Sequence, residues 1–279
     1  MKNLWLKNKT VIITGASGGL GFGIAKILIE KYSCKVYGIA RNEEKIKSAI
    51  TTLSNPENFS YRLFDVCDES AWKNFALELE REGIIPDILI NNAGFMLPFA
   101  KFEKYTDNEI NEIINTNFVS VVKACKLFIP YLKKSQTPAI INVSSSAGLC
   151  AVVGESMYCS TKFAVRGFTE TLAVDYKKQI YVGGVYPGFI KTNILNRMAT
   201  KDKENKLINK LMMPQDKACK KIVKGIKRRK KRMVFGFDGR SLGFISRLMP
   251  KSAPSIVASV LKASKLELFD NVFDKGDNK

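Results

Sequence analysis

The stretch Thr14-Gly15-Ala16-Ser17-Gly18-Gly19-Leu20-Gly21 decides the fold of this chain. It follows an apolar, β-branched run at 11–14 that predicts a buried strand, and it precedes a segment at 21–32 with near-helical apolar spacing. Glycine adopts positive φ and lets the backbone approach a pyrophosphate, while the helix N-terminus directs its N–H groups at that charge. The stretch therefore predicts a nucleotide-binding turn.

Beyond this turn, strand-like and helix-like segments alternate along the chain. Strands are predicted at 36–40, 59–64, 88–90, 139–143, 181–185 and 233–237, and helices at 43–53, 71–81, 108–132 and 158–176. This order is typical of an α/β fold, a doubly wound parallel sheet (Rossmann-like) with helices on both faces. We expect a catalytic domain at 1–238 and a helical, amphipathic extension at 239–279, which Pro250 and Pro254 divide into two pieces.

The composition excludes several classes of site. The 279 residues contain no histidine, which rules out a Ser-His-Asp hydrolase and a histidine metal centre. The six cysteines are scattered without a Cys-x-x-Cys pair, so we expect no metal site. No run of eighteen apolar residues and no signal peptide stand out, which predicts a cytoplasmic protein without a membrane-spanning helix.

The net charge of +19 favours acidic partners such as nucleotide phosphates, anionic lipid or an acidic carrier protein. The densest basic run, at 227–232, could be a nucleic-acid patch or a solvated helix end. We interpret it as a helix end and expect no nucleic-acid binding, because no recognised nucleic-acid module accompanies it.

Arg41 stands at the end of the second predicted strand, about twenty residues after the glycine turn. An acidic residue there would bind a ribose 2′-hydroxyl and repel a 2′-phosphate, whereas a guanidinium suits phosphate. The sequence therefore favours NADP(H) over NAD(H).

Tyr158 and Lys162 lie four residues apart at the start of a predicted helix, so both project from one face. A nearby ammonium favours the phenolate and lowers the pKa of the tyrosine, which lets the phenol exchange a proton with a carbonyl or carbinol oxygen. Ser144, Ser145 and Ser146 follow the fifth strand, at the sheet edge where parallel sheets place their sites.

With these features in place, residues 8–237 resemble the short-chain dehydrogenase/reductase family. The matching motifs are the glycine turn, Asp65-Val66, Asn91-Asn92-Ala93-Gly94, Asn117, Ser145, Tyr158-Cys159-Ser160-Thr161-Lys162, Tyr186-Pro187-Gly188 and Thr192.

The resemblance implies a catalytic role for four residues. Tyr158 would be the acid in carbonyl reduction and the base in alcohol oxidation, and Lys162 would hold the nicotinamide ribose and lower the tyrosine pKa. Ser145 would fix the substrate oxygen, and Asn117 would orient a water that links the lysine to solvent. It also implies a homodimer or homotetramer.

A larger set of residues would contact NADP(H) if the resemblance holds. Its members are Gly15, Ser17, Gly19, Leu20, Gly21, Arg41, Asp65, Val66, Asn92, Ala93, Gly94, Tyr158, Lys162, Pro187, Gly188, Ile190 and Thr192.

The segments expected to frame the substrate are mostly apolar, with Phe95, Met96, Leu149, Val152 and Phe189 as candidates. Such a pocket suits an apolar carbonyl compound: a steroid-like, fatty or aromatic ketone or aldehyde. Two alternatives stay open, a 3-oxoacyl carrier-protein reductase and a regulator that binds NADPH without turnover.

The extension also has more than one interpretation. Residues 240–265 carry apolar and basic side chains that could contact an anionic membrane surface. They could instead cover the cleft or pack between subunits, and we favour a lid or packing role.

Overall fold

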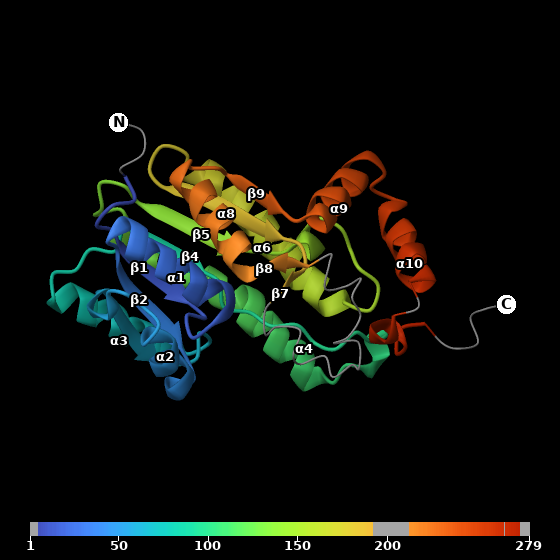
Figure 1. Ribbon diagram of the computed structural model, residues 1–279, viewed down its shortest axis with the longest axis horizontal. Coiled ribbons are helices and arrows are strands. Elements are labelled where there is room, and N and C mark those ends of the chain that lie inside the picture. Colours follow the sequence, from blue (N-terminus) through green and yellow to red (C-terminus); the bar gives the residue numbers. More distant parts are fainter. Residues whose placement is uncertain (1–4, 192–211, 265, 274–279) are drawn as a thin grey trace.

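A seven-stranded, all-parallel sheet forms the centre of the computed structural model, which describes residues 5–191, 212–264 and 266–273. The strand order is β3-β2-β1-β4-β5-β6-β9 (Figure 1). The predicted doubly wound fold is confirmed. The strands are β1 (Thr10–Thr14), β2 (Lys35–Ala40), β3 (Phe59–Leu63), β4 (Ile88–Asn91), β5 (Ala139–Val143), β6 (Tyr181–Pro187) and β9 (Arg232–Phe235).

Two hydrophobic layers cover the sheet because successive side chains of a strand point to opposite faces. Val11 and Ile13 pack in one layer with the helices α1 (Gly19–Tyr32), α2 (Glu43–Ile50) and α8 (Gln215–Lys227). Ile12 packs in the other with α3 (Glu69–Arg81), α5 (Ser120–Leu132) and α6 (Ser156–Asp175). Burial on both faces explains why the strands read as continuous apolar runs.

The predicted helix at 108–132 is interrupted. It consists of α4 (Asp107–Ile114), a π-helical segment (Asn115–Val119) and α5. By length and composition alone this stretch could cross a membrane. In this fold Cys125 and Phe128 are fully buried in the core beside the sheet, so here it is a core helix.

Helix α8 was not predicted from the sequence. It packs on α1, where a Cβ on Gly23 would lie 2.6 Å from the Cys219 Sγ, so glycine permits the close approach. Ala218, Ile222 and Ile226 give it an apolar stripe at helical spacing. The helix ends at Lys227 within the basic run, whose residues 228–232 are exposed, as the helix-end interpretation expected.

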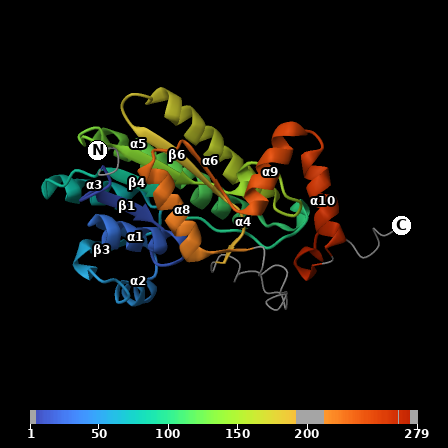
Figure 2. The same cartoon turned by 45° about the horizontal axis from the view of Figure 1, so that its top comes forward.

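The C-terminal region forms α9 (Phe237–Leu248), α10 (Ala253–Ala263) and a 3₁₀ turn (Glu267–Phe269) at the end of the molecule away from the N-terminus (Figures 1 and 2). The chain forms two helices here, as predicted, with Pro250 between them and Pro254 in the first turn of α10. Phe269 packs edge-on against Phe99 with ring centroids 4.8 Å apart. The extension therefore shares a hydrophobic cluster with the segment that follows β4.

One face of the extension stays exposed. Phe244, Leu248 and Val260 are each more than half exposed. Contact of this face with a membrane, and the division of the chain at 238, stay predictions.

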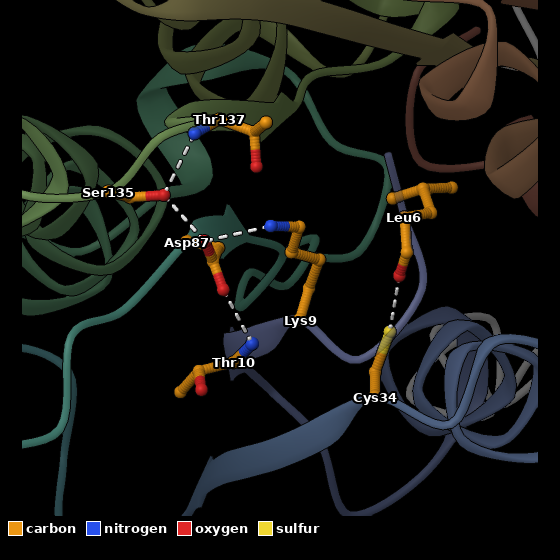
Figure 3. A network of polar contacts seen from close by, with 7 residues as sticks. All are labelled: Leu6, Lys9, Thr10, Cys34, Asp87, Ser135 and Thr137. Atoms are coloured by element: carbon orange, nitrogen blue, oxygen red, sulfur yellow. Dashed lines mark hydrogen bonds and ion pairs between the residues drawn. The ribbon is translucent and has the colours of Figure 1, made fainter. Parts of the chain in front are cut away.

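Asp87 joins three segments at the amino-terminal edge of the sheet (Figure 3). Its carboxylate accepts hydrogen bonds from the Thr10 backbone N–H (2.9 Å), the Lys9 ammonium (3.4 Å) and the Ser135 hydroxyl. These contacts link the starts of β1 and β4 to the turn before β5. The opposite, carboxyl edge carries the polar residues singled out from the sequence.

Candidate active site

A cleft of about 340 Å³ opens at the carboxyl ends of β1, β4, β5 and β6. It spans the point between β1 and β4 where the chain changes direction across the sheet, which is where such sheets bind ligands. Most predicted site residues line it. They are Gly15, Gly19, Leu20, Arg41, Asn92, Ala93, Gly94, Phe95, Met96, Ser145, Val152, Tyr158, Lys162, Pro187, Gly188, Phe189 and Ile190.

The other predicted residues lie elsewhere. Ser17, Gly21, Asp65, Val66 and Asn117 are near the cleft in sequence or fold but do not line it. Leu149 was expected in the substrate pocket, but it is buried beneath α9, where a Cβ on Gly243 would lie 3.2 Å from it. Thr192 lies outside the described residues.

The glycine turn fits a pyrophosphate. Gly15 (φ 66°) and Gly19 (φ 53°) adopt positive φ, and a Cβ on Gly21 would lie 2.3 Å from the Gly15 carbonyl oxygen. The first turn of α1, described in full, carries no acidic side chain to neutralise its positive dipole end. The Gln215 amide donates to the Gly19 carbonyl (2.9 Å), so α8 supports the turn.

Arg41 lies at the adenosine end expected of this cleft and pairs with Asp65 at 3.1 Å. Partial burial raises the pKa of Asp65, but hydrogen bonds from Cys67 and Arg41 outweigh it, so the net pKa lies below its ordinary value. Both side chains are about half exposed, and exposed pairs of this kind are weak. A phosphate could therefore share the guanidinium with Asp65.

Asn117 lies in the π-helical segment, a distortion frequent at functional sites. Its carboxamide accepts from the Phe95 N–H (2.9 Å) and donates to the Phe95 carbonyl (2.8 Å) and the Thr161 hydroxyl (3.3 Å). The side chain is fully buried, so it positions the turn after β4. Its link to a water stays a prediction.

Tyr158, Ser145 and Lys162 meet inside the cleft. Ser145 hydrogen-bonds the Tyr158 phenol, and the Lys162 Nζ lies 5.5 Å from the tyrosine ring centroid. The ammonium donates to the Val143 carbonyl at 3.3 Å. All three side chains are at most 9% exposed, so water has little access to the reacting group.

Burial controls the proton affinity of this cluster. It raises the pKa of the Tyr158 phenol, the charge of Glu155 adds to this, and the Ser145 hydrogen bond lowers it only in part. Burial also lowers the pKa of Lys162 to about 8. The sequence predicted a lowered tyrosine pKa, but in the folded chain desolvation of the phenol outweighs that effect.

The cleft is also lined by residues outside the predicted site set, namely Gly18, Val143, Ser144, Ser146, Ala147, Glu155 and Leu242. Leu242 of α9 lines the cleft, and Asp238 accepts from the Phe189 N–H at 2.6 Å, which ties the extension to the turn after β6. Glu155 lines the cleft one helical turn before Tyr158 and is 4% exposed. Glu155 could have been found from the sequence, because it lies three residues before Tyr158. No sequence pattern indicates that Leu242 or Asp238 lies near the cleft.

Comparison with known proteins agrees with this geometry. A profile described as short chain dehydrogenase matches residues 9–203. A 3-oxoacyl-[acyl-carrier-protein] reductase of Chlamydia trachomatis is 34% identical over 68% of this chain and 77% of its own. An NADPH-dependent pterin aldehyde reductase of Arabidopsis thaliana is 29% identical over 67% and 77%. The crystal structure of a short-chain dehydrogenase from Streptomyces avermitilis superposes with a TM-score of 0.76 at 23% identity, covering 93% of this chain and all of the other.

The buried carboxyl of Glu155 generates a prediction about stability. Burial raises its pKa from 4.5 to about 8, so between these values the unfolded chain releases a proton that the folded chain keeps. This group therefore lowers the free energy of unfolding as pH rises through that window, by ~1.4 kcal/mol per pH unit at most. We expect Glu155→Gln to unfold at higher denaturant concentration than the wild type at pH 8, with a gap that closes toward pH 4.5. Equal gaps at both pH values in chemical denaturation would contradict a buried, protonated Glu155.

Proposed function

Because this chain belongs to the short-chain dehydrogenase family, we propose that it is an NADP(H)-dependent oxidoreductase that interconverts an apolar ketone or aldehyde and its alcohol. The observation that carries the proposal is the meeting of the glycine turn and the Ser145–Tyr158–Lys162 cluster in one cleft. Carbonyl reduction needs both parts: the turn that binds the nucleotide carrying the hydride, and the Tyr158 phenol that donates the proton.

The protein's own residues supply the proton and the positioning. Tyr158 gives its phenolic proton to the carbonyl oxygen as negative charge develops there, and Ser145 holds that oxygen by a hydrogen bond. The phenol is protonated at neutral pH, as proton donation to a carbonyl oxygen requires, and burial raises its pKa further. When bound, NADP(H) supplies the hydride to the carbonyl carbon or takes it back from the alcohol.

The cofactor would lie between the glycine turn and the turn after β6. Gly15, Gly19 and the α1 N-terminus would hold the pyrophosphate, and Arg41 the 2′-phosphate. Lys162 would hold the nicotinamide ribose. The name of the Arabidopsis relative, an NADPH-dependent reductase, supports the phosphorylated nucleotide.

The walls around Tyr158 support an apolar substrate. Phe95, Met96, Val152, Phe189 and Leu242 line this part of the cleft. A second candidate is 3-oxoacyl carrier-protein reduction, which the Chlamydia relative and the positive net charge favour. We rank an apolar small molecule above an acyl carrier protein as the substrate, because Leu242 of the C-terminal extension adds a further apolar side chain to the cleft. Because Ser145, Tyr158 and Lys162 lie together in the cleft, we favour an enzyme over a regulator that binds NADPH without turnover.

A cytoplasmic location and a homodimer or homotetramer belong to the same proposal. Both are supported by the resemblance to the family. The location is also supported by the core position of the stretch at 107–132, which among the described residues is the helix long and apolar enough to cross a membrane.

Tyr158→Phe removes the proton donor and keeps the ring. We expect kcat for ketone reduction to fall at least ~100-fold, since general acid catalysis is worth about that much, while NADPH still binds within ~3-fold. Stopped-flow NADPH oxidation and fluorescence titration measure the two quantities. Tyr181→Phe, which removes a hydroxyl bonded to the Lys230 carbonyl outside the cleft, is the control. Undiminished turnover in Tyr158→Phe would overturn the mechanism.

Arg41→Ala tests the choice of nucleotide. The wild type should bind NADPH more tightly than NADH, and the variant should lose ~10-fold of that preference, or about 1.4 kcal/mol, because a charged hydrogen bond to the 2′-phosphate is gone. Isothermal titration with each nucleotide gives the ratio, with Lys47→Ala on the exposed side of α2 as control. Tighter NADH binding by the wild type, or an unchanged ratio in Arg41→Ala, would show that the nucleotide is assigned wrongly.

The apolar cleft predicts the substrate preference. Aromatic or fatty ketones should exceed aldose sugars by at least ~10-fold in kcat/KM, because most of the hydroxyls of a sugar would lose water without finding partners on these largely apolar walls. Initial rates with NADPH over a panel of both classes measure this. Equal rates on sugars would reject the apolar substrate class.

A further inference from the structure

Glu155 is a carboxyl side chain in the substrate part of the cleft that the proton transfer does not use. It lies at the N-cap of α6, three residues before Tyr158, so the two side chains share a helix face. Its backbone is fixed, since its N–H donates to the Val152 carbonyl (3.3 Å) and its carbonyl accepts from the Cys159 N–H (2.8 Å).

The side chain lacks a partner where proteins normally provide one. Its Oε1 is buried and has no hydrogen-bond partner among the described residues. Buried polar side chains are nearly always satisfied, and each exception calls for an explanation. Because Glu155 is one of the residues that line the cleft, a ligand that reaches its carboxyl group would satisfy an oxygen that the described residues leave unpaired.

Among the residues that the structure describes, no charged group compensates the burial of Glu155. The ionisable side chains that feel the charge of Glu155 are Tyr105, Tyr158 and Cys159. Burial raises the pKa of all three, so each is neutral at neutral pH. The Tyr105 hydroxyl donates to the Gly154 carbonyl (2.7 Å) instead. The neighbouring cleft walls, Met96 and Val152 among them, are apolar.

We propose that Glu155 is a specificity-determining residue that hydrogen-bonds a donor group, an amine or a hydroxyl, on an otherwise apolar carbonyl substrate. The inference rests on the proposed function and narrows its substrate class. A ligand with such a donor satisfies the buried oxygen, whereas a ligand without it leaves the oxygen desolvated and unpaired. Sites that hydrogen-bond a substrate group discriminate strongly against analogues that lack it.

The test compares three ketones on one ring skeleton: unsubstituted, hydroxyl-bearing and amine-bearing. In the wild type we expect at least one donor-bearing ketone to exceed the unsubstituted one by ~10-fold or more in kcat/KM, chiefly through KM. Glu155→Leu should reverse this order. Glu155→Gln should keep the hydroxyl preference and lose the amine preference, because an amide still accepts a hydrogen bond but, unlike a carboxyl group, cannot ionise to pair with an ammonium.

Binding gives a second readout that does not need turnover. In the Tyr158→Phe background, with NADPH present, the donor-bearing ketone should raise the melting temperature more than the unsubstituted ketone, and Glu155→Leu should remove that difference. Glu170→Gln, an exposed carboxyl on the same helix that pairs with Arg166, is the matched control and should change neither ratio.

The outcomes separate the two proposals. If the wild type reduces the unsubstituted ketone but shows the same three-ketone ratios as Glu155→Leu, the role of Glu155 is refuted and the oxidoreductase assignment stands. If Glu155→Gln changes the pH profile of all three ketones equally, Glu155 acts on Tyr158 alone and the inference is also refuted. If no ketone is reduced and NADPH does not bind, the proposed function itself fails.

Discussion

A single hydroxyl joins the two halves of the cleft. Thr14 ends β1, and its buried Oγ1 accepts hydrogen bonds from the backbone N–H groups of both Asn92 and Ala93, each at 2.9 Å. The Asn92 amide returns a bond to the Thr14 carbonyl at 2.9 Å. The glycine turn begins at Thr14 and the segment that leads to Phe95 begins at Asn92. This contact, together with the pairing of β1 and β4, therefore places the two sides of the cleft next to each other.

Burial sets the proton affinities of the cluster. The phenol of Tyr158 lies in an apolar, water-poor setting that raises its pKa, while the same setting lowers that of Lys162 to about 8. A protonated phenol is ready to donate, which suits reduction of a carbonyl. The extension adds to this enclosure, since Phe269 and Val272 pack in the same cluster as Tyr158.

Much of this arrangement could be predicted from local patterns. Runs such as Val11, Ile12 and Ile13 predict strands because both faces of the sheet are covered, and Tyr158 with Lys162 follows from helical spacing. Helix α8 was not predicted because lysines surround its apolar stripe. Leu149 was expected in the substrate pocket, but α9 covers it, and only the folded chain shows that contact. The missing partner of Glu155 is a property of three-dimensional packing, which no sequence pattern reports.

In the proposed reaction, one cleft brings a nicotinamide hydride and the Tyr158 proton to the same carbonyl group. The most direct measurement is reduction of an apolar aromatic ketone with NADPH deuterated at C4 of the nicotinamide, followed by mass spectrometry and NMR of the alcohol. We expect one deuterium on the carbinol carbon when one of the two C4 positions is labelled, and none when the other is. NADPH consumption without deuterium in the alcohol from either label, or no alcohol at all, would contradict it.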